Sequence, residues 1–494
     1  MRQGCLGSQA ASVQIAESPR RGGWRSLRRL GWSQLERRAA LIFILASVAF
    51  GAAISTVVPP LRGPDEIAHF LRIYSYARGM VLPAAEVNGR KGVFVAPELD
   101  AQLTFFKNAG ERFGQNRERG LRYPEIMNEY PQLSATSAQQ APVFMPFAGT
   151  EGYNAVAYAP YIIAVAIADL LGLNFPSMLL FMRLTGLVTF TVVAAYAIKL
   201  MPTLKWAFVL TAMLPVSIYN RAVLSADGAA LAYALMITAL SFRAIDRHVP
   251  AWQRSLWTTL CTLSKQPQIV FIVLELMVSR LTDVRQRWRK VALVVVPSLI
   301  LSPLWVLAVS AEIAVWRLGM AETYPREQFN PLWKLAYMWE HPLHFPVAMW
   351  TTVTVWGDRL WPELIGILGW QDVWLPVWVY LILTMTLLFV PLQKLDLPGD
   401  VRARVATITG LCAIGYFFAV YLIFFLTYTP VEIDHIRGVQ GRYFVIALPL
   451  AAIFLASIVN VNLPARMVAA AAVTGALISG IASFWSLLWA HWLP

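Results

Sequence analysis

Charged residues are scarce in this chain of 494 residues, at 14% of the total, whereas apolar residues reach 57% and the mean hydropathy is +0.55. These values exclude a soluble domain of this length. Repeated apolar stretches near 20 residues predict an all-α polytopic membrane protein with about 10 to 13 transmembrane helices. Cysteine is equally scarce. Cys5, Cys261 and Cys412 are far apart, which excludes a disulfide framework and a cysteine metal site.

The chain also lacks the P-loop, GxGxxG, HExxH and GxSxG patterns, so the soluble-enzyme chemistries that depend on them are not supported. The net charge is +13. The basic residues cluster between the apolar runs, where the positive-inside rule places them. The charge therefore indicates orientation in a membrane, and we expect no nucleic-acid partner.

Arginines dominate the N-terminal segment, and we expect residues 1 to about 35 to be disordered, basic and cytoplasmic. The apolar run Ala39–Val58 is too long for a signal-peptide core and no cleavage pattern follows it, which predicts an uncleaved first span. Residues 36–494 then form a single integral membrane domain. The basic clusters place external loops at about 59–178, 310–374 and 427–443.

Two apolar segments need a special topology. The basic residues Lys199 and Arg243 both fall on the cytoplasmic side only if Ala155–Leu171 does not cross, so we interpret it as a juxtamembrane or re-entrant helix. The segment after Arg254 predicts a hairpin that turns at Lys265 and returns to the cytoplasm. Its first arm is short, which places Lys265 partly within the bilayer. The tryptophan-rich stretch before residue 375 predicts amphipathic helices along the outer leaflet.

The segment 61–72, just outside the first span, carries a dense set of polar groups. A Gly-Pro pair predicts that a helix begins there. Asp65, His69 and Arg72 recur at i, i+4 and i+7, so they share one helical face. Asp65 and Glu66 fall in the first turn, where the helix dipole favours carboxylates.

Other polar groups are predicted on the same outer side. Asp227 precedes an apolar helix, and the third external loop carries Arg437 and Arg442. Lys265 joins them from within the bilayer. Carboxylates suit a general base or a divalent cation, and arginine and lysine bind phosphate. An enzyme that uses a lipid-phosphate-linked donor needs both kinds of group.

Each of these residues also has a structural interpretation. Asp65 caps its helix, His69 is solvated at the interface, Asp227 belongs to a turn, and Lys265 neutralises a helix end. Arg437 and Arg442 anchor lipid headgroups, Arg183 snorkels outward from its span, and Glu275 has a structural role. Sequence alone leaves these alternatives open.

The order of the motifs resembles a bacterial polytopic family, domain of unknown function 2142, over roughly residues 40 to 460. A tryptophan-leucine-aspartate motif is expected in that family where this chain has Trp370-Gln371-Asp372. The matching motifs are Gly63-Pro64-Asp65-Glu66 with His69 and Arg72, Tyr153–Pro160, Leu224-Ser225-Ala226-Asp227, Leu368-Gly369-Trp370-Gln371-Asp372 with Pro376, and Gly438-Val439-Gln440-Gly441-Arg442-Tyr443-Phe444.

That family is in turn similar to the GT-C glycosyltransferases, multi-span enzymes that use polyprenyl-phosphate sugars outside the membrane. The resemblance implies a GT-C-like fold with juxtamembrane helices in the first external loop, in the bacterial inner membrane. It implies a polyprenyl-phosphate sugar donor, a glycan or lipid acceptor and contact with membrane lipids. The implied catalytic residues are Asp65, Glu66 and Asp227, with Asp65 and Glu66 as candidate ligands of a divalent cation. The implied substrate-binding residues are His69, Arg72, Lys265, Arg437, Gln440, Arg442, Tyr443 and Trp370.

Two alternatives use the same residues. A transporter or flippase of lipid-linked sugars would spread its charged groups through the bilayer depth, whereas an enzyme would confine them to the outer third. A non-catalytic subunit of a polysaccharide assembly complex is the other alternative.

Overall fold

The computed structural model describes residues 34–83, 85–116, 122–130, 141–278, 284–314, 324–393, 395–459, 461 and 463–493. Most of the segment predicted to be disordered lies outside these residues. The described chain is helical apart from one small sheet. Its elements are α1 Gln34–Val57, α2 Glu66–Ala77, β1 Ala85–Val87, β2 Arg90–Val95, α3 Pro97–Asn116, α4 Tyr123–Met127, β3 Val143–Pro146, α5 Ala155–Leu170, α6 Phe175–Leu200, α7 Lys205–Ala212, α8 Pro215–Ala222, α9 Ala226–Ala244, α10 Ala251–Ser264, the 3-10 helix η4 Gln266–Met277, α11 Val284–Ala314, η5 Arg326–Phe329, α13 Pro331–Glu340, α14 His344–Ile365, α15 Val377–Phe389, α16 Gly399–Tyr428, η6 Gly441–Ala447, α17 Leu448–Ile458 and α18 Ala465–His491.

Six helical segments in the described part of the chain are long and apolar enough to cross a membrane, and the bent pair α8–α9 makes up to seven. The protein is therefore an all-α polytopic membrane protein, as predicted. The six segments are Arg38–Val57, Phe175–Leu200, Arg285–Val309, Gly399–Tyr428, Gly441–Ile458 and Ala465–His491.

The predicted 10 to 13 spans exceed this number because several apolar runs form short or broken helices. The helices α5, η4 and α15 have 16, 12 and 13 residues. At 1.5 Å per residue even α5 extends only about 24 Å, less than the roughly 30 Å of a bilayer core. Helix α9 meets α8 at an angle of 119°. A hydropathy pattern marks apolar segments but does not show where a helix ends or bends within them. The structure gives those helix bounds and bends.

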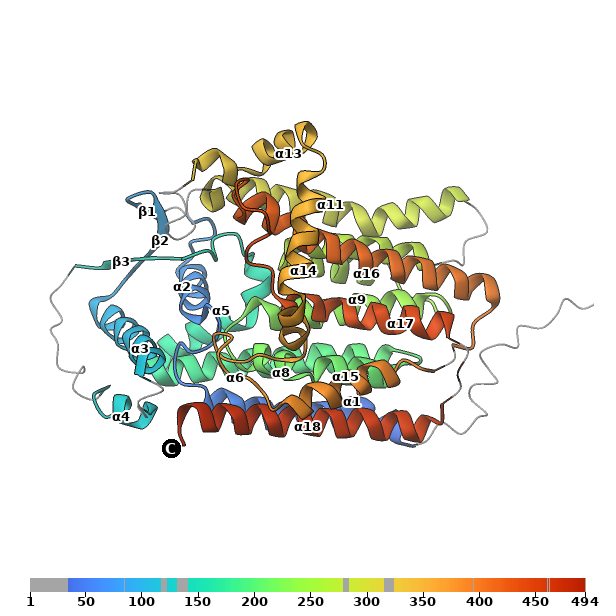
Figure 1. The fold of residues 1–494 in the computed structure, drawn as a ribbon, viewed down its shortest axis with the longest axis horizontal. Helices are drawn as coiled ribbons and strands as arrows, with labels where there is room; N and C mark the ends of the chain where they lie inside the picture. Colours follow the sequence, from blue (N-terminus) through green and yellow to red (C-terminus); the bar gives the residue numbers. More distant parts are fainter. Residues whose placement is uncertain are drawn as a thin grey trace, which may run out of the picture.

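The long helices lie side by side along one direction, and the smaller elements between α1 and α5 gather at one end (Figure 1). There, α2 to α4 accompany an antiparallel sheet of order β1-β2-β3, in which Phe94 pairs with Phe144. The C-terminal end of α18 reaches the same end of the bundle. Helix α1 packs against both α6 and α18.

The helices α10 and η4 form the predicted hairpin. Arg254, near the start of α10, donates to both carboxylate oxygens of Glu275 in η4, each at 2.8 Å, and both side chains are buried. Lys265 lies between the two arms and is therefore the tip of the hairpin. Because α10 is about 21 Å long, the tip does not reach across a bilayer core of roughly 30 Å. The pair also agrees with the structural role predicted for Glu275.

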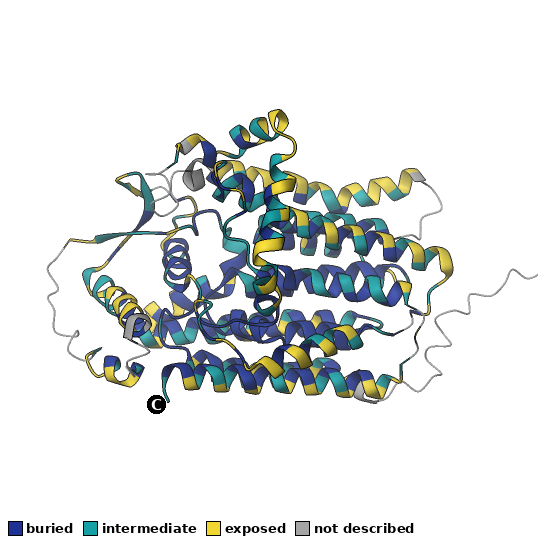
Figure 2. Cartoon of the chain, viewed as in Figure 1, coloured by how far each residue is buried: buried dark blue, intermediate teal, exposed yellow. Residues whose placement is uncertain are grey.

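Helix α9 lies at the centre of the bundle and is buried along nearly its whole length (Figure 2). Exposed apolar side chains instead cover the outward faces of peripheral helices such as α11, α15 and α18. This pattern is typical of a bundle whose perimeter contacts lipid. The burial of α9 places Asp227, in its first turn, inside the protein.

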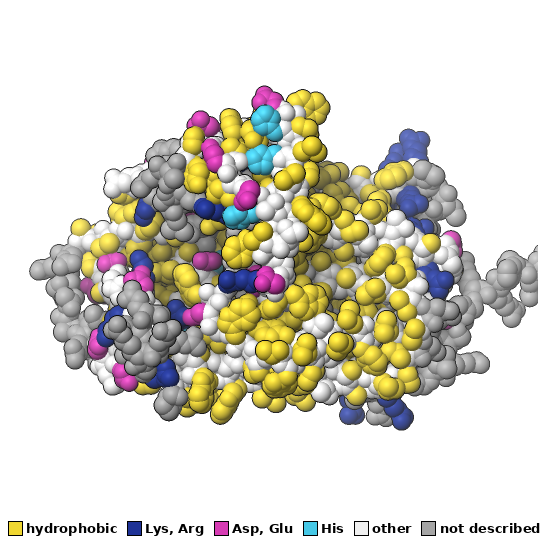
Figure 3. Space-filling model, viewed as in Figure 1, with side chains coloured by type: hydrophobic (Ala, Val, Ile, Leu, Met, Phe, Trp, Pro, Cys, Tyr) yellow, Lys and Arg dark blue, Asp and Glu magenta, His cyan; other side chains and the backbone are white. Residues whose placement is uncertain are grey.

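Helix α14 runs across the long helices (Figure 1) and is not among the segments that qualify as spans. Its side chains Trp350, Trp356 and Trp361 are exposed, in agreement with the predicted amphipathic helices at an interface. Lysine and arginine side chains gather at the end of the bundle opposite α2–α4, whereas acidic and basic side chains mix at the other end (Figure 3).

Candidate functional site

Asp65 occupies an unusual backbone position immediately before α2. Its φ and ψ angles are 53° and 22°, in the left-handed region, and its backbone carbonyl accepts the amide of His69 at 3.0 Å. Its side chain makes no capping hydrogen bond and is 57% exposed. The helix begins at Glu66, two residues after Pro64, and Asp65 precedes it instead of lying in its first turn. The carboxylate is therefore not used to cap α2, against the structural interpretation, and it remains available to a ligand.

Asp227 lies in the first turn of α9, behind the N-cap Ser225, whose hydroxyl accepts the Asp227 amide at 3.0 Å. Its carboxylate has two further partners. Asn220 Nδ2 donates to Oδ2 at 3.3 Å, and Lys265 Nζ forms an ion pair with Oδ1. Asp227 thus connects the tip of the α10–η4 hairpin to the bend between α8 and α9.

Arg442 lies between the two carboxylates. Its Nη2 atom is 3.9 Å from Asp65 Oδ2, and its Nε atom is 4.0 Å from Asp227 Oδ2. The neighbouring residue Gly441 allows this placement, because a Cβ there would overlap the carbonyl of Leu360 in α14. The four predicted charged residues Asp65, Asp227, Lys265 and Arg442 therefore meet in one cluster, the charged cluster.

The ring of Tyr443 covers the two cations of the charged cluster. Lys265 Nζ lies 4.8 Å from the ring centroid, and the Arg442 guanidinium carbon lies 5.3 Å from it. Cation–π attraction of this kind is worth about 0.5 to 2 kcal/mol. Tyr443 thus positions both cations. Gln440 is the residue before η6, and its side-chain oxygen is buried without a hydrogen-bond partner among the described residues.

His69 joins the cluster from α2, one turn after Asp65. It is buried, and its Nδ1 atom lies 2.5 Å from the hydroxyl of Tyr158. Burial lowers the pKa of His69 to about 4, although Asp65 and Asp227 act in the opposite direction. The imidazole is therefore neutral at pH 7. The interpretation of His69 as a solvated interfacial residue is wrong, because the side chain is enclosed.

The structure brings Glu66 to a different place. Arg183 Nε donates to its Oε1 at 2.8 Å and Nη2 donates to Oε2 at 2.6 Å; the amides of Gly63 and Leu224 donate as well. The Glu66 residue is fully buried. The interpretation that Arg183 snorkels outward is therefore wrong. The side chain instead joins α6 to the start of α2. We interpret the pair as part of the scaffold.

This pairing also bears on the predicted cation site. Because Arg183 occupies both oxygens of Glu66, the geometry does not fit a cation shared by Asp65 and Glu66. Among the residues that the structure describes, no group of three histidine, cysteine or acidic side chains is close enough to hold a metal ion.

Arg72 is also directed away from the charged cluster. It is fully buried, and its Nη2 atom donates to the Tyr76 hydroxyl at 2.7 Å and to the Val81 carbonyl at 2.9 Å. Burial raises the pKa of Tyr76 to about 12. Arg72 thus holds the end of α2 against the following turn. Helical spacing predicted one shared face for Asp65, His69 and Arg72, but Asp65 precedes α2 and the Arg72 side chain is directed to Tyr76 and Val81.

The loop after α14 approaches the opening motif. Arg62 Nη2 donates to Asp372 Oδ2 at 2.6 Å, and the hydroxyl of Tyr219 donates to the Arg62 carbonyl at 3.0 Å. The Trp370 side chain is 50% exposed. Arg437 is half-buried in the loop between α16 and η6, where its amide donates to the Thr429 hydroxyl at 3.1 Å. The substrate-binding roles of Trp370 and Arg437 stay predictions.

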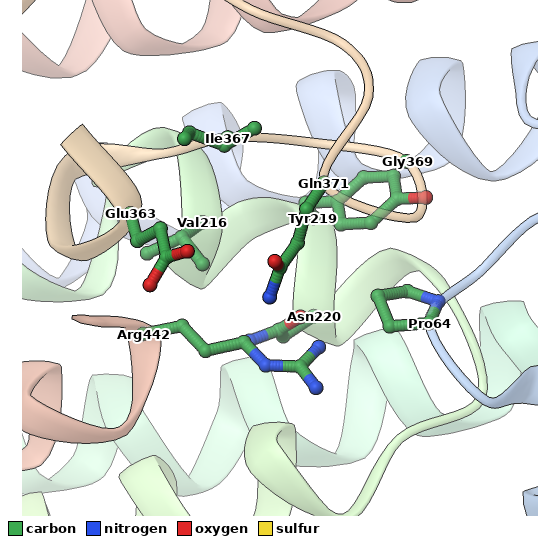
Figure 4. A pocket seen from close by; sticks show the side chains of 9 residues that line it. All are labelled: Pro64, Val216, Tyr219, Asn220, Glu363, Ile367, Gly369, Gln371 and Arg442. Carbon is green, nitrogen blue, oxygen red and sulfur yellow. The ribbon is translucent and has the colours of Figure 1, made fainter. Parts of the chain in front are cut away.

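A small pocket of about 10 Å³, room for about one water molecule, adjoins the charged cluster (Figure 4). The sequence did not single out most of its polar residues. Asn220 lies in the short, mixed helix α8, and Glu363 lies near the C-terminal end of α14. The pocket is lined by Pro64, Val216, Tyr219, Asn220, Glu363, Ile367, Gly369, Gln371 and Arg442.

Comparison with known proteins gives one match. The family of predicted membrane proteins DUF2142 matches residues 48–454, which include every residue of the charged cluster and of the pocket. No curated protein and no solved structure matches the chain.

Proposed function

The chain belongs to the DUF2142 family of predicted membrane proteins, and we propose that it is a membrane glycosyltransferase. It transfers a sugar from a polyprenyl-phosphate donor to a cell-envelope glycan or lipid on the extracytoplasmic face of the bacterial inner membrane. One observation carries the proposal. An exposed carboxylate without a capping role, Asp65, lies 3.9 Å from Arg442, which shares Asp227 with Lys265. Base and phosphate-binding cations are thus side by side.

In the proposed reaction, an acceptor hydroxyl oxygen attacks the anomeric carbon of the donor sugar while the bond from that carbon to the phosphate oxygen breaks. Asp65 takes the hydroxyl proton. The polyprenyl phosphate leaves with the bonding electrons, and Lys265 and Arg442 stabilise its negative charge. The exposure of Asp65 allows its proton to return to water after each turnover.

Asp227 acts in this proposal as a positioning residue. Its carboxylate is 14% exposed and contacts Lys265, Arg442 and Asn220. It holds the two cations in register before the phosphate arrives. Such preorganisation is the main contribution that a site makes to the stabilisation of a leaving group.

The transporter alternative is less well supported. The charged cluster is confined to one place, where the hairpin tip meets the ends of α2, α9 and η6. The other buried ion pair of the hairpin, Arg254–Glu275, is closed on itself by two hydrogen bonds. A transport path would need charged or polar groups distributed between these points.

Orientation follows from charge. Lysine and arginine gather at the end of the bundle opposite α2–α4 (Figure 3). The positive-inside rule makes that end cytoplasmic. The N-terminus is then cytoplasmic and the charged cluster faces outward, which is the side where a lipid-linked donor is consumed in this proposal.

The test uses the purified protein in lipid nanodiscs with a panel of polyprenyl-phosphate sugars. We expect release of polyprenyl phosphate by the wild type and its loss in Asp65→Asn. Asparagine tolerates the left-handed backbone, and no cap bond is removed, so Asp65→Asn folds normally. Asp169→Asn on α5 is the matched control, because it removes an exposed carboxylate that is paired with Arg78. Equal turnover by Asp65→Asn and the wild type would exclude the proposed base.

A further inference from the structure

Tyr153 lies shortly before α5, and the reaction described above gives it no role. Its ring centroid lies 5.5 Å from that of the His69 imidazole and 6.0 Å from that of the Tyr158 ring. Its backbone carbonyl accepts the Tyr76 hydroxyl at 2.7 Å. The hydrogen bond fixes the backbone, and the ring contacts hold the side chain beside His69.

The Tyr153 hydroxyl borders the charged cluster. Burial raises the pKa of this phenol, while Lys265 and Arg442 act in the opposite direction. The hydroxyl therefore stays protonated at neutral pH and lies within electrostatic range of both cations. It makes no hydrogen bond to a residue that the structure describes, and it is not enclosed. Its O–H group is thus available to donate to a ligand.

The imidazole of His69 has a defined tautomer. Tyr158 is fully buried, and His69 Nδ1 is the one partner of its hydroxyl among the described residues. Burial raises the pKa of Tyr158 well above its usual value, so the hydroxyl keeps its proton. Because an enclosed O–H group without an acceptor is costly, Nδ1 accepts from it. The proton of the neutral imidazole is then on Nε2.

The Nε2–H group of His69 is a second donor at the charged cluster. It makes no hydrogen bond within the described part of the chain, and it is not enclosed. All four residues of the charged cluster act on the pKa of His69, so the imidazole lies within their electrostatic range. His69 and Tyr153 therefore supply two neutral donors beside Lys265 and Arg442.

The charges of the cluster indicate what these donors bind. Its two carboxylates offset its two cations, so the cluster has no net charge. The phosphate of a phosphodiester has only acceptor oxygens. Neutral donors satisfy those oxygens that the cations leave unpaired, without the cost of burying another charge. A hydroxyl ligand would also need acceptors, but the Asp227 carboxylate is already engaged with Lys265 and Asn220.

We propose that the Tyr153 hydroxyl and the Nε2–H group of His69 donate to the non-bridging oxygens of the lipid-linked phosphate, beside the two cations of the charged cluster. This phosphate subsite rests on the proposed function and deepens it. It adds Tyr153, a residue without an assigned role, and it gives His69 a specific atom and protonation state. Tyr76 and Tyr158 are positioning residues, because each holds one of the two donors.

Binding of farnesyl phosphate, a short lipid phosphate, tests the subsite without any turnover. The wild-type protein in nanodiscs is titrated with farnesyl phosphate, and farnesol is the uncharged probe with the same tail. Tyr153→Phe removes one hydroxyl and keeps the ring contacts, so it should fold normally and bind farnesyl phosphate about tenfold more weakly. Tyr196→Phe removes an exposed hydroxyl on α6 and should bind as the wild type does.

Nitrogen NMR of protein with isotope-labelled histidine tests the tautomer. The chain has six histidines, and the signals that His69→Gln lacks belong to His69. We expect a proton on Nε2 and none on Nδ1, and we expect the Nε2 signal to shift when farnesyl phosphate is added. Tyr158→Phe removes the hydroxyl that donates to Nδ1, so the preference for this tautomer should weaken. A merely structural role of His69 would leave the Nε2 signal unchanged by the ligand.

The outcomes separate this subsite from the proposed reaction. Asp65→Asn should bind farnesyl phosphate at least as tightly as the wild type, because Asp65 is the base and does not bind phosphate. Equal affinity of Tyr153→Phe and the wild type for farnesyl phosphate would overturn the subsite, whatever the turnover of Asp65→Asn. A proton on Nδ1, or wild-type binding no tighter for farnesyl phosphate than for farnesol, would also overturn it.

Discussion

The Nη2 atom of Arg442 lies 3.9 Å from Asp65 Oδ2, although 377 positions separate the two residues in the chain. The contact joins the segment after α1 to the segment after α16. It places a planar, permanently charged group between the proposed base and the carboxylate of Asp227. This arrangement leads to the first prediction.

Arg442→Lys should reduce release of polyprenyl phosphate by about tenfold or more, equivalent to roughly 1.4 kcal/mol of lost stabilisation. Lysine keeps the charge but lacks the fork that reaches both carboxylates and a phosphate together. Donor turnover in nanodiscs is the measurement, and Arg78→Lys on the surface is the control. Wild-type turnover by Arg442→Lys would assign Arg442 to headgroup anchoring.

Glu66→Gln should chiefly destabilise the protein. The change leaves the buried guanidinium of Arg183 without its charged partner, and breaking a buried ion pair from one side costs about 3 to 5 kcal/mol. We expect a lower melting temperature and a lower yield than for Asp65→Asn. The double variant Glu66→Gln/Arg183→Met should recover part of the loss, because no unpaired charge remains. An unchanged melting temperature together with lost turnover would instead place Glu66 in the chemistry.

Acid should destabilise the fold through His69. Its pKa is about 4 in the folded state and about 6.5 when unfolded, so between these values the unfolded chain binds more protons. The His69 contribution to stability is therefore complete above pH 6.5 and is lost as the pH falls towards 4. Its maximum size is about 3 kcal/mol.

The measurement for His69 is the melting temperature at pH 7 and pH 5. Wild-type protein should lose more stability over this interval than His69→Gln, which has no proton to bind. Equal losses in the two proteins would show that His69 does not titrate on unfolding.

Cysteine labelling of intact cells tests the orientation. Trp370 and Trp252 are both exposed but lie on opposite predicted sides. In a Cys5→Ser background, Trp370→Cys should react with an impermeant maleimide, and Trp252→Cys should react only after the membrane is opened. Cys261 and Cys412 are buried and contribute little background. The reverse labelling pattern would overturn both the N-terminal orientation and the external site.

The sequence by itself determined the class of the protein and predicted a larger set of polar residues, to which the members of the charged cluster belong. Long apolar runs predict helices in a membrane, because a helix forms all the hydrogen bonds of its backbone N–H and C=O groups within one segment. Charges between the apolar runs predicted the α10–η4 hairpin with Lys265 near its tip. The same charges placed Asp65, Asp227 and Arg442 on one side, where the structure brings them together.

Only the tertiary structure decided which of these groups are closed in ion pairs and which meet in the charged cluster. Glu66 directly follows Asp65 in the chain, yet it is paired with Arg183, 117 positions later. Asn220 and Glu363 meet at one pocket because α8 and α14 pack against each other. Helical periodicity is a local property and predicts faces. Ion pairs and pockets depend on which helices become neighbours and on how far each side chain reaches, which no local pattern contains.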